Sequence, residues 1–275
     1  MSKDRLDVLM VTRGLFPSRE KAKAAIMAGI VSVNGRMTDK AGTPIAIDAI
    51  IDVKENPCPF VGRGGLKLAK AFNEFKLDVK DKVAIDIGAS TGGFTDCMLQ
   101  NGAKRVYAID VGYGHLDYSL RNNPLVVNIE KTNIRYFDPE LILDPVEFIS
   151  IDVSFISLTL VLPIASKLLE NDGQMVCLVK PQFEAGKDQV GKGGIVKDKS
   201  IHIQVIEKVI CSARDQDLQL EGLTFSPIKG AKGNIEYLLL FRKAKEGVLE
   251  FDVSKAVLIA QEALNVKEKI KGETK

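Results

Sequence analysis

A glycine-rich segment that directly follows an apolar run constrains the fold of this chain more than any other feature. The segment Asp86–Phe94 has the sequence D-I-G-A-S-T-G-G-F, follows an apolar run at 82–87 and opens a helical pattern at 93–100. A buried strand, a glycine-rich turn and a helix in this order form the first unit of a doubly wound α/β sheet. Ligands bind such sheets at the carboxyl ends of the strands, so we expect a ligand site at this loop.

Strands and helices alternate along the rest of the chain, which is typical of a doubly wound sheet with helices on both faces. The predicted fold class is therefore α/β, with a Rossmann-like domain as the larger part. We expect strands at 82–87, 105–111, 126–128, 148–153 and 173–179, helices at 93–100, 157–169 and 201–213, and a closing pair of strands at 220–225 and 235–241.

The first sixty residues follow a different pattern and predict a small α+β domain. Serine is a favourable N-cap of a helix, and an Asn-Gly pair between apolar residues is the strongest short signal for a hairpin. In chain order we expect a helix over 3–14, a second helix from the N-cap Ser18 to Gly29, strands at 30–33 and 45–53, and a hairpin turn at Asn34-Gly35.

The segment Asn56-Pro57-Cys58-Pro59 indicates a linker between the two domains. A residue that precedes proline is biased toward extended backbone, which makes such a segment stiff. We predict a first domain over 1–56, a linker over 57–62, a second domain over 63–245, and a C-terminal helix with a charged tail over 246–275.

Charge is distributed unevenly between the two predicted domains. The chain has 275 residues, of which 38 are basic and 36 acidic, and the net charge of +2 excludes a histone-like polycation. Nine basic and seven acidic residues lie in residues 1–60, so the first fifth of the chain carries the whole net charge. A local basic surface in the first domain is therefore compatible with the small net charge.

Cysteine usage and hydropathy exclude further classes. The four cysteines form no CxxC pair and there are only two histidines, so we expect no metal site and, in a reducing cytosol, free thiols. The first thirty residues are too charged for a signal peptide, and no apolar run approaches the ~20 residues that span a bilayer. We expect a cytoplasmic protein that does not insert into membranes.

The first domain resembles a known RNA-binding module. The segments R-L-D at 5–7, S-R-E-K-A-K-A-A-I at 18–26 and G-I-V-S-V-N-G at 29–35 are similar to the S-four-type RNA-binding domain of ribosomal proteins and pseudouridine synthases. Dispersed cations suit phosphate contacts, although an amphipathic helix also carries solvated charges without any partner. The candidate RNA-binding residues are Arg5, Arg19, Lys21, Lys23 and Arg36.

The glycine-rich loop resembles the S-adenosylmethionine loop of class I methyltransferases. Its spacing G-x-x-x-G-G differs from the dinucleotide fingerprint G-x-G-x-x-G. By this resemblance, Gly88 lets the backbone approach the methionine part of the cofactor, and Asp86 supports the loop and the ammonium group of the ligand. The candidate cofactor-binding residues are Asp86, Gly88, Ala89, Ser90, Thr91, Gly92, Gly93, Asp110 and Val111.

The residue Asp110, at the end of the second strand, strengthens the prediction of a nucleoside-containing cofactor. An acidic residue there can accept both ribose hydroxyls, and it lies about 20 residues beyond the glycines, as such units require. Proteins that bind NAD use the same device, so Asp110 alone does not distinguish the two cofactors.

A second glycine-rich segment, 186–193, fits the phosphate-binding pattern GxxxxGK but has Gly193 where that pattern has Ser or Thr. That hydroxyl would hold magnesium, and the segment also lies beyond Pro181 instead of at a strand-to-helix turn. We therefore do not expect ATP binding, and we interpret 184–194 as a mobile basic loop over the active site.

Two lysines and two carboxylates lie at converging places in the predicted sheet. Lys67 precedes the first strand, Asp152 and Lys180 end the fourth and fifth strands, and Glu236 begins the last strand. They match the Lys-Asp-Lys-Glu tetrad of the FtsJ-like RNA ribose 2′-O-methyltransferases. With the N-terminal module, the chain resembles the TlyA family of rRNA 2′-O-methyltransferases, also known as hemolysins. The segments that carry the resemblance are RGGLK, DIGASTGGFTD, DVGYG, DVSFIS, LVKPQFE and GNIEY, in that order.

The resemblance implies S-adenosylmethionine-dependent methylation of a ribose 2′-hydroxyl, with ribosomal RNA or a ribosomal subunit as the partner. By the family's roles, Lys180 is the general base, Asp152 orients it, and Lys67 and Glu236 position the ribose. A lysine serves as a base only when burial or a neighbouring cation lowers its pKa, and Lys67 is the candidate for that cation. The transfer needs no metal ion.

Three other functions remain as alternatives. A base methyltransferase would usually carry an Asn/Asp-Pro-Pro-Tyr/Phe run after the fourth strand, where this chain has Asp152-Val153-Ser154-Phe155. A pyrimidine C5-methyltransferase would need a nucleophilic cysteine, and the candidate, Cys58, lies in the predicted linker, remote from the fourth strand. A pore-forming hemolysin would need a segment that inserts into membranes. A non-catalytic RNA-binding protein would not need the tetrad.

Overall fold

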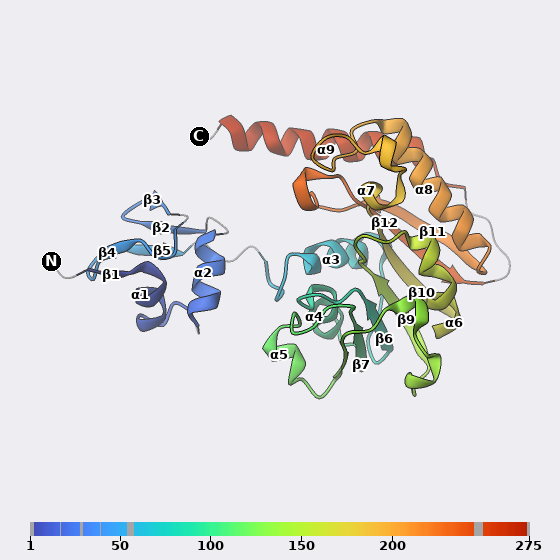
Figure 1. Cartoon of the computed structure of the whole chain (residues 1–275), viewed down its shortest axis with the longest axis horizontal. Helices are drawn as coiled ribbons and strands as arrows, with labels where there is room; N and C mark the ends of the chain where they lie inside the picture. Colours follow the sequence, from blue (N-terminus) through green and yellow to red (C-terminus); the bar gives the residue numbers. More distant parts are fainter. Residues whose placement is uncertain are drawn as a thin grey trace. The chain divides into compact units, whose positions relative to one another are not determined.

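The computed structural model describes residues 3–16, 18–27, 30–38, 40–53, 58–244 and 250–273. The chain divides into two compact units, Met1–Pro59 and Phe60–Lys275, and each is described by itself (Figure 1). The domain boundaries predicted at 56–57 and 245–246 and the helix end predicted at Gly29 lie outside the described residues.

The first unit packs two helices against short strands. The predicted hairpin is confirmed: Asn34 and Gly35 have φ of 49° and 76°, as a two-residue turn between antiparallel strands requires. Strand β1 pairs with β4, and β2 pairs with both β3 and β5. The elements are β1 (Lys3–Arg5), α1 (Leu6–Thr12), α2 (Arg19–Met27), β2 (Val31–Val33), β3 (Arg36–Met37), β4 (Pro44–Ala46) and β5 (Ile51–Val53).

The first helix is shorter than predicted, because Lys3–Arg5 form a strand instead of a helical turn. These residues pair antiparallel with Pro44–Ala46, so long-range pairing overrides the local helical pattern. The second helix begins as predicted, since the Ser18 hydroxyl accepts a hydrogen bond from the backbone N–H of Lys21 at 3.3 Å. The apolar faces of both helices form the buried cluster of this unit.

The buried carboxylate of Asp7 joins the start of α1 to the start of α2. It accepts hydrogen bonds from Nε and Nη2 of Arg5, at 2.9 and 3.0 Å, and from Nη2 of Arg19 at 3.0 Å. The two guanidinium groups hold the pKa of Asp7 down at about 2. Asp7 therefore orients two arginines whose side chains stay about half exposed, at 49% and 48%.

The second unit is built on a seven-stranded sheet with the order β11-β12-β10-β9-β6-β7-β8, in which only β12 runs antiparallel to its neighbours. Its elements are α3 (Gly64–Phe75), β6 (Val83–Ile87), α4 (Gly93–Gln100), β7 (Arg105–Ile109), α5 (Tyr118–Arg121), β8 (Val126–Ile129), β9 (Val146–Ile151), α6 (Leu162–Leu168), β10 (Leu169–Val179), α7 (Pro181–Glu184), α8 (Lys199–Arg214), β11 (Leu218–Phe225), β12 (Tyr237–Lys243) and α9 (Val253–Glu273). The predicted doubly wound α/β fold is confirmed.

Strand order places a ligand site at β6 and β9. The chain runs outward from β6 through β7 to β8 and then returns to the other side of β6 with β9. The carboxyl ends of these two central strands lie at the topological switch point, where open α/β sheets bind ligands.

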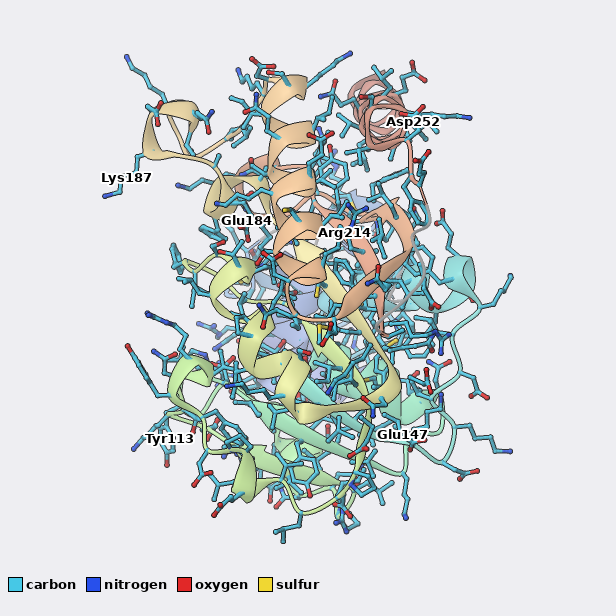
Figure 2. All side chains as sticks on the ribbon, turned by 90° about the vertical axis from the view of Figure 1, so that its right-hand side faces the viewer. Tyr113, Glu147, Glu184, Lys187, Arg214 and Asp252 are labelled. Carbon is cyan, nitrogen blue, oxygen red and sulfur yellow. The ribbon has the colours of Figure 1, made fainter. Side chains whose placement is uncertain are left out.

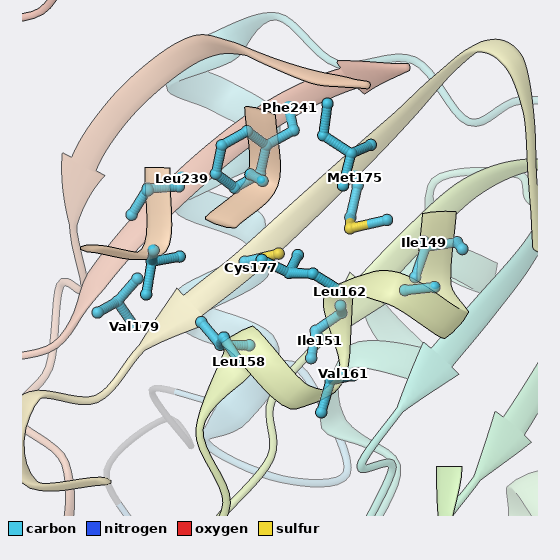
Figure 3. Packing of buried hydrophobic residues seen from close by; sticks show 14 of the residues in the cluster. Ile149, Ile151, Leu158, Val161, Leu162, Met175, Cys177, Val179, Leu239 and Phe241 are labelled. Carbon is cyan, nitrogen blue, oxygen red and sulfur yellow. The ribbon is translucent and has the colours of Figure 1, made fainter. Parts of the chain in front are cut away.

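Helices cover both faces of the sheet. Alternate strand residues face α3 and α4 on one side, where Phe148 and Leu178 are buried, and face α6, α8 and α9 on the other. Figure 3 shows part of the second face, where Ile149, Met175 and Phe241 from three neighbouring strands pack together. The first half of α9 belongs to this core through Val257, Ala260 and Leu264, so the C-terminal helix is an integral part of the second unit.

One predicted helix is divided in two. Residues 157–169 were expected to be one helix, but a short 3-10 turn at Leu158–Leu160 precedes α6, and Leu169 already belongs to β10. Pro163 explains the division, because it lacks a backbone N–H and fits only the first turn of a helix. Within the part of the chain that the structure describes, no helix combines the length and hydropathy needed to cross a membrane.

The Asp7 contacts predict how the stability of the first unit depends on pH. The folded pKa of about 2 lies below the ordinary value of about 3.9, so the contribution is complete above pH 4 and is lost as the pH falls toward 2. We expect Asp7→Asn to destabilise the unit by about 1.5–3 kcal/mol at pH 7, because it removes charge-assisted hydrogen bonds, and the difference should shrink toward pH 2.

Amide hydrogen exchange of α1 and α2 in the full chain measures this effect. The matched control is Asp52→Asn, which changes an exposed aspartate on β5 of the same unit. Parallel pH profiles for the wild-type protein and Asp7→Asn would contradict the role given to Asp7.

Candidate active site

Two cavities meet at the carboxyl ends of β6 and β9. The larger, of about 780 Å³, extends along β7, and the smaller, of about 250 Å³, extends toward α3. Both are lined by Gly88, Ser90, Asp152 and Ser154. The two cavities are therefore adjacent and share these four lining residues.

The glycine-rich loop is pressed against the end of β9. Gly88 has a φ of 86°, and a Cβ there would lie 2.5 Å from the carbonyl oxygen of Asp152. The backbone N–H of Asp152 also donates to the carbonyl of Ile87 at 2.9 Å. Only glycine permits this approach, and the approach brings the loop and the Asp152 carboxylate to the same point.

Asp86 lies beneath the loop, not at its surface. Its fully buried carboxylate accepts hydrogen bonds from the backbone N–H and hydroxyl of Thr95, at 2.8 and 2.7 Å, and from the Ser150 hydroxyl at 3.2 Å. Burial raises the pKa of Asp86 to about 7. Asp86 is not among the residues that line either cavity, so its contact with the ammonium group of a ligand stays a prediction.

Asp110 closes the loop from the neighbouring strand. One carboxylate oxygen accepts a hydrogen bond from the Ser90 N–H at 2.8 Å, and the other accepts from the Gly112 N–H at 2.6 Å. The larger cavity is lined by Asp110, Val111, Gly88 and Ser90. The smaller cavity is lined by Gly88, Ala89, Ser90, Thr91 and Gly93, whereas Gly92 is buried and lines neither cavity.

The larger cavity has an apolar wall that the sequence did not predict. Phe155 is 91% exposed, has a φ of 63°, and places its ring 4.9 Å from that of Phe183. Aliphatic side chains of the same cavity come from the strand ends and from the loop after β8. The apolar lining residues are Ile87, Ile109, Val111, Ile134, Val153, Phe155, Ile156, Leu160 and Phe183.

The four predicted catalytic residues form one chain of alternating charges. The Lys180 ammonium lies 2.5 Å from Oδ1 of Asp152, and the Lys67 ammonium lies 3.8 Å from Oδ2 of the same carboxylate. Lys67 also donates to Oε2 of Glu236 at 2.7 Å. The side chains of Lys180, Asp152, Lys67 and Glu236 are only 9%, 17%, 11% and 2% exposed.

These four side chains come from four separate elements. Lys67 is on the first turns of α3, Asp152 follows β9, Lys180 follows β10, and Glu236 directly precedes β12. A loop covers Glu236 closely, since a Cβ at Gly230 would lie 1.9 Å from its Oε1. Strand ends and one helix N-terminus thus bring together residues that are up to 169 positions apart.

Ser154 is a further polar residue of the site that the sequence did not single out. Its hydroxyl accepts a hydrogen bond from the Lys180 ammonium at 2.9 Å, and it lines both cavities. Serines near strand ends are common, so only the convergence of β9 and β10 reveals this contact. The smaller cavity is also lined by Arg63, Ile228 and Lys229, which no sequence pattern indicated.

The segment 184–194 does not line either cavity. Buried Glu184 anchors its beginning by accepting hydrogen bonds from the Ser157 hydroxyl at 2.5 Å and the Leu158 N–H at 2.7 Å. Figure 2 shows Lys187 beyond Glu184, with its side chain directed away from the body of the unit. The carbonyl of Gly194 accepts a hydrogen bond from the Asn234 amide at 2.8 Å, which ties the segment to the loop before Glu236.

The predicted RNA-binding residues lie on the first unit and differ in their surroundings. Arg5 and Arg19 are held by Asp7, whereas Lys21 and Arg36 are exposed and Lys23 is half-buried. Asp7 is the functional candidate that the sequence did not reveal. Asp7 is only two residues from Arg5 in the sequence, but Arg19 lies twelve residues away and contacts Asp7 only because the two helices pack together.

Comparisons with known proteins agree with this architecture. Residues 60–243 match the family model of FtsJ-like methyltransferases, and residues 4–51 match the S4 domain. The chain is 53% identical over 246 residues to YqxC of Bacillus subtilis, named as a candidate rRNA methyltransferase, covering 89% of this chain and 88% of that protein. It is 41% identical over 246 residues to the 16S/23S rRNA (cytidine-2′-O)-methyltransferase TlyA of Mycobacterium tuberculosis, covering 89% and 92%.

A solved structure is similar over nearly the whole length. A hemolysin candidate from Streptococcus thermophilus superposes with a TM-score of 0.79 and 46% identity, over 98% of this chain and 99% of that one. The same two-part architecture therefore occurs in proteins named for RNA methylation and in one named for haemolysis.

Proposed function

Because this chain belongs to the TlyA family, in which an S4 domain is joined to an FtsJ-like methyltransferase domain, we propose that it methylates a ribose 2′-hydroxyl of ribosomal RNA with S-adenosylmethionine as the methyl donor. The observation that carries the proposal is the contact between Lys180 and Asp152 at the place where the two cavities meet. A buried amine held there can act on a hydroxyl in the smaller cavity.

The larger cavity fits the cofactor by its size and the chemistry of its lining. A volume of about 780 Å³ lies within the range of small-molecule and cofactor sites. Its apolar wall suits an adenine ring, and the Asp110 carboxylate at the end of β7 suits ribose hydroxyls. When bound, S-adenosylmethionine supplies an electrophilic methyl group on a positively charged sulfur.

The residues of the site would have different roles toward the ribose 2′-hydroxyl, which is the methyl acceptor. Lys180 would take the proton of the 2′-hydroxyl onto Nζ while the oxygen forms its bond to the methyl carbon. The bond between that carbon and the sulfur would break in the same step, with S-adenosylhomocysteine as the leaving group. Asp152 holds the Lys180 amine, and Lys67 bridges Asp152 to Glu236 on the side toward α3. Holding two reactants in line can remove up to roughly 7–11 kcal/mol of the barrier, so positioning by this array would be a large contribution to catalysis.

The alternative acceptors are less well supported by the site. Neither cavity is lined by a cysteine, and Cys58, the candidate nucleophile for C5-methylation, belongs to the first unit. The hemolysin name of a similar structure is accounted for by family membership and needs no second activity at this site.

Cofactor binding is the first prediction. We expect calorimetry to show micromolar binding of S-adenosylmethionine and no binding of NADH. Asp110→Ala should weaken binding at least tenfold, because it removes a carboxylate that lines the cavity and fixes Ser90 and Gly112. Its turnover should recover in part at high cofactor concentration. Asp138→Ala, at an exposed aspartate that caps a 3-10 turn, is the matched control. Binding of NADH alone would exclude the proposal.

The role of Lys180 is the second prediction. Lys180→Ala should reduce methylation by at least 10²–10⁴-fold, the usual contribution of a general base, and leave cofactor affinity nearly unchanged. Lys180→Arg should be almost as damaging, because a guanidinium keeps the charge and cannot lose a proton near neutral pH.

Mass mapping of 2′-O-methyl groups on rRNA and single-turnover rates across pH measure both variants. The wild-type rate should rise with pH, and Lys180→Arg should lose that dependence. Lys104→Ala, at an exposed lysine next to the opposite end of the sheet, should behave as wild type. Near-normal methylation by Lys180→Arg would show that Lys180 only provides charge.

RNA binding through the first unit is the third prediction. Salt weakens binding in proportion to the number of phosphates that cations neutralise, by a slope of about 0.7–0.9 per contact. We expect Lys21→Ala with Arg36→Ala to weaken rRNA binding and to reduce the slope of log affinity against log salt by about 1–2. Lys80→Ala, at an exposed lysine of the second unit, is the control. Equal slopes for the wild-type protein and the double variant would show that Lys21 and Arg36 do not contact RNA phosphates.

A further inference from the structure

We propose that Ser154 is a positioning residue for methyl transfer, because its hydroxyl holds one hydrogen of the Lys180 amine and so directs the lone pair of that amine into the smaller cavity. The inference rests on the proposed role of Lys180 as the base. It starts from two contacts of Lys180 Nζ, one to Asp152 Oδ1 at 2.5 Å and one to Ser154 Oγ at 2.9 Å.

These two contacts determine the direction of the lone pair because the neutral amine has only two hydrogens. A protonated lysine has three N–H donors, whereas the neutral form that accepts a proton has two N–H groups and one lone pair. The Ser154 hydroxyl accepts a hydrogen bond from one of these N–H groups. The Asp152 carboxylate, whose Oδ1 forms an ion pair with the amine at 2.5 Å, attracts the other by its charge. The lone pair then occupies the tetrahedral direction that remains. Without the Ser154 hydroxyl, the amine would have only the charge of Asp152 near it, and it could rotate about its Cε–Nζ bond and direct the lone pair elsewhere.

Both residues that contact the amine come from the same place in the fold. Asp152 and Ser154 are two residues apart after β9, and both line the two cavities at their meeting point. Lys180 lines only the smaller cavity and is 8% exposed, which leaves its amine little freedom to move. The Lys67 ammonium lies 3.8 Å from the other oxygen of Asp152 and forms an ion pair with Glu236 at 2.7 Å, so the Asp152 carboxylate lies between two opposite charges.

The local backbone does not account for the direction in which the Ser154 hydroxyl points. The turn after β9 is held by the backbone hydrogen bond from Asp152 to Ile87 and by the packing of Gly88 against it. The hydroxyl is instead directed across to the end of β10, where Lys180 lies 26 positions further along the chain. The ring centre of Phe183, a residue of α7, lies 5.9 Å from the Lys180 ammonium.

Single-turnover methylation of rRNA at saturating S-adenosylmethionine, measured across pH in the full chain, tests the proposal. We expect Ser154→Ala to lower the plateau rate by roughly 10²-fold, the cost of misplacing a reacting group by about 1 Å. The rate should still rise with pH, because Lys180 is still present. The melting temperature should stay close to the wild-type value. Because Ser154 also lines the larger cavity, calorimetry measures cofactor affinity separately, and any decrease in affinity should be much smaller than the decrease in plateau rate.

Two further variants separate positioning from a structural effect. Ser154→Thr keeps the hydroxyl and should recover most of the plateau rate. Ser200→Ala removes an exposed serine hydroxyl from the first turn of α8 and should behave as wild type. A loss that Thr does not rescue, or a loss of cofactor affinity in the same proportion as the rate, would overturn the proposal.

Failure of the inference and failure of the proposed function are distinguishable. If Lys180→Ala is inactive and Ser154→Ala retains the full plateau rate, the positioning role is wrong and the proposed function stands. If the wild-type protein transfers no methyl group to rRNA, or Lys180→Ala retains the wild-type rate, the function assigned to the site is wrong and the role of Ser154 is excluded with it.

Discussion

The site depends on Asp152, where the fold and the chemistry meet. Its backbone fixes the glycine-rich loop, through a hydrogen bond to Ile87 and close contact with Gly88. Its two carboxylate oxygens contact different lysines, Lys180 at 2.5 Å and Lys67 at 3.8 Å. A change in the position of this residue would therefore move the glycine-rich loop and both lysines together. The switch point between β6 and β9 is what places it there.

Burying four charged side chains is costly, which indicates that they are kept for function. Removing charges from water is repaid only by good geometry and additional hydrogen bonds, and a buried ion pair is often no more stable than apolar residues of similar volume. The alternation from Lys180 through Asp152 and Lys67 to Glu236 provides each charge with an opposite neighbour. Removing Asp152 would take away the opposite charge next to Lys180, and removing Lys67 would take away the one next to Glu236, so the two inner members hold the array together.

The sequence predicted the parts of this site that depend on strand ends and missed the parts that depend on packing between elements. Asp152 and Lys180 were predictable, because parallel strands bring their carboxyl ends to one edge. The contact of Ser154 with Lys180 was not, since it depends on the relative register of β9 and β10. The N-terminal helix was predicted too long for a related reason: Lys3–Arg5 pair with a strand about forty residues away.

In the proposed function, the first unit provides affinity for RNA and the second unit provides the chemistry. The distribution of charge in the two units is consistent with this division. The net charge of the chain lies in its first sixty residues, where Asp7 orients Arg5 and Arg19 with half of each side chain left accessible. Arginines that are already oriented lose less entropy when they bind phosphates than free side chains do. The two lysines of the second unit, by contrast, form ion pairs with Asp152 and Glu236 and are nearly buried. In the proposed function, attraction to the RNA backbone would therefore come from the first unit, and the buried array of the second unit would act on a single ribose.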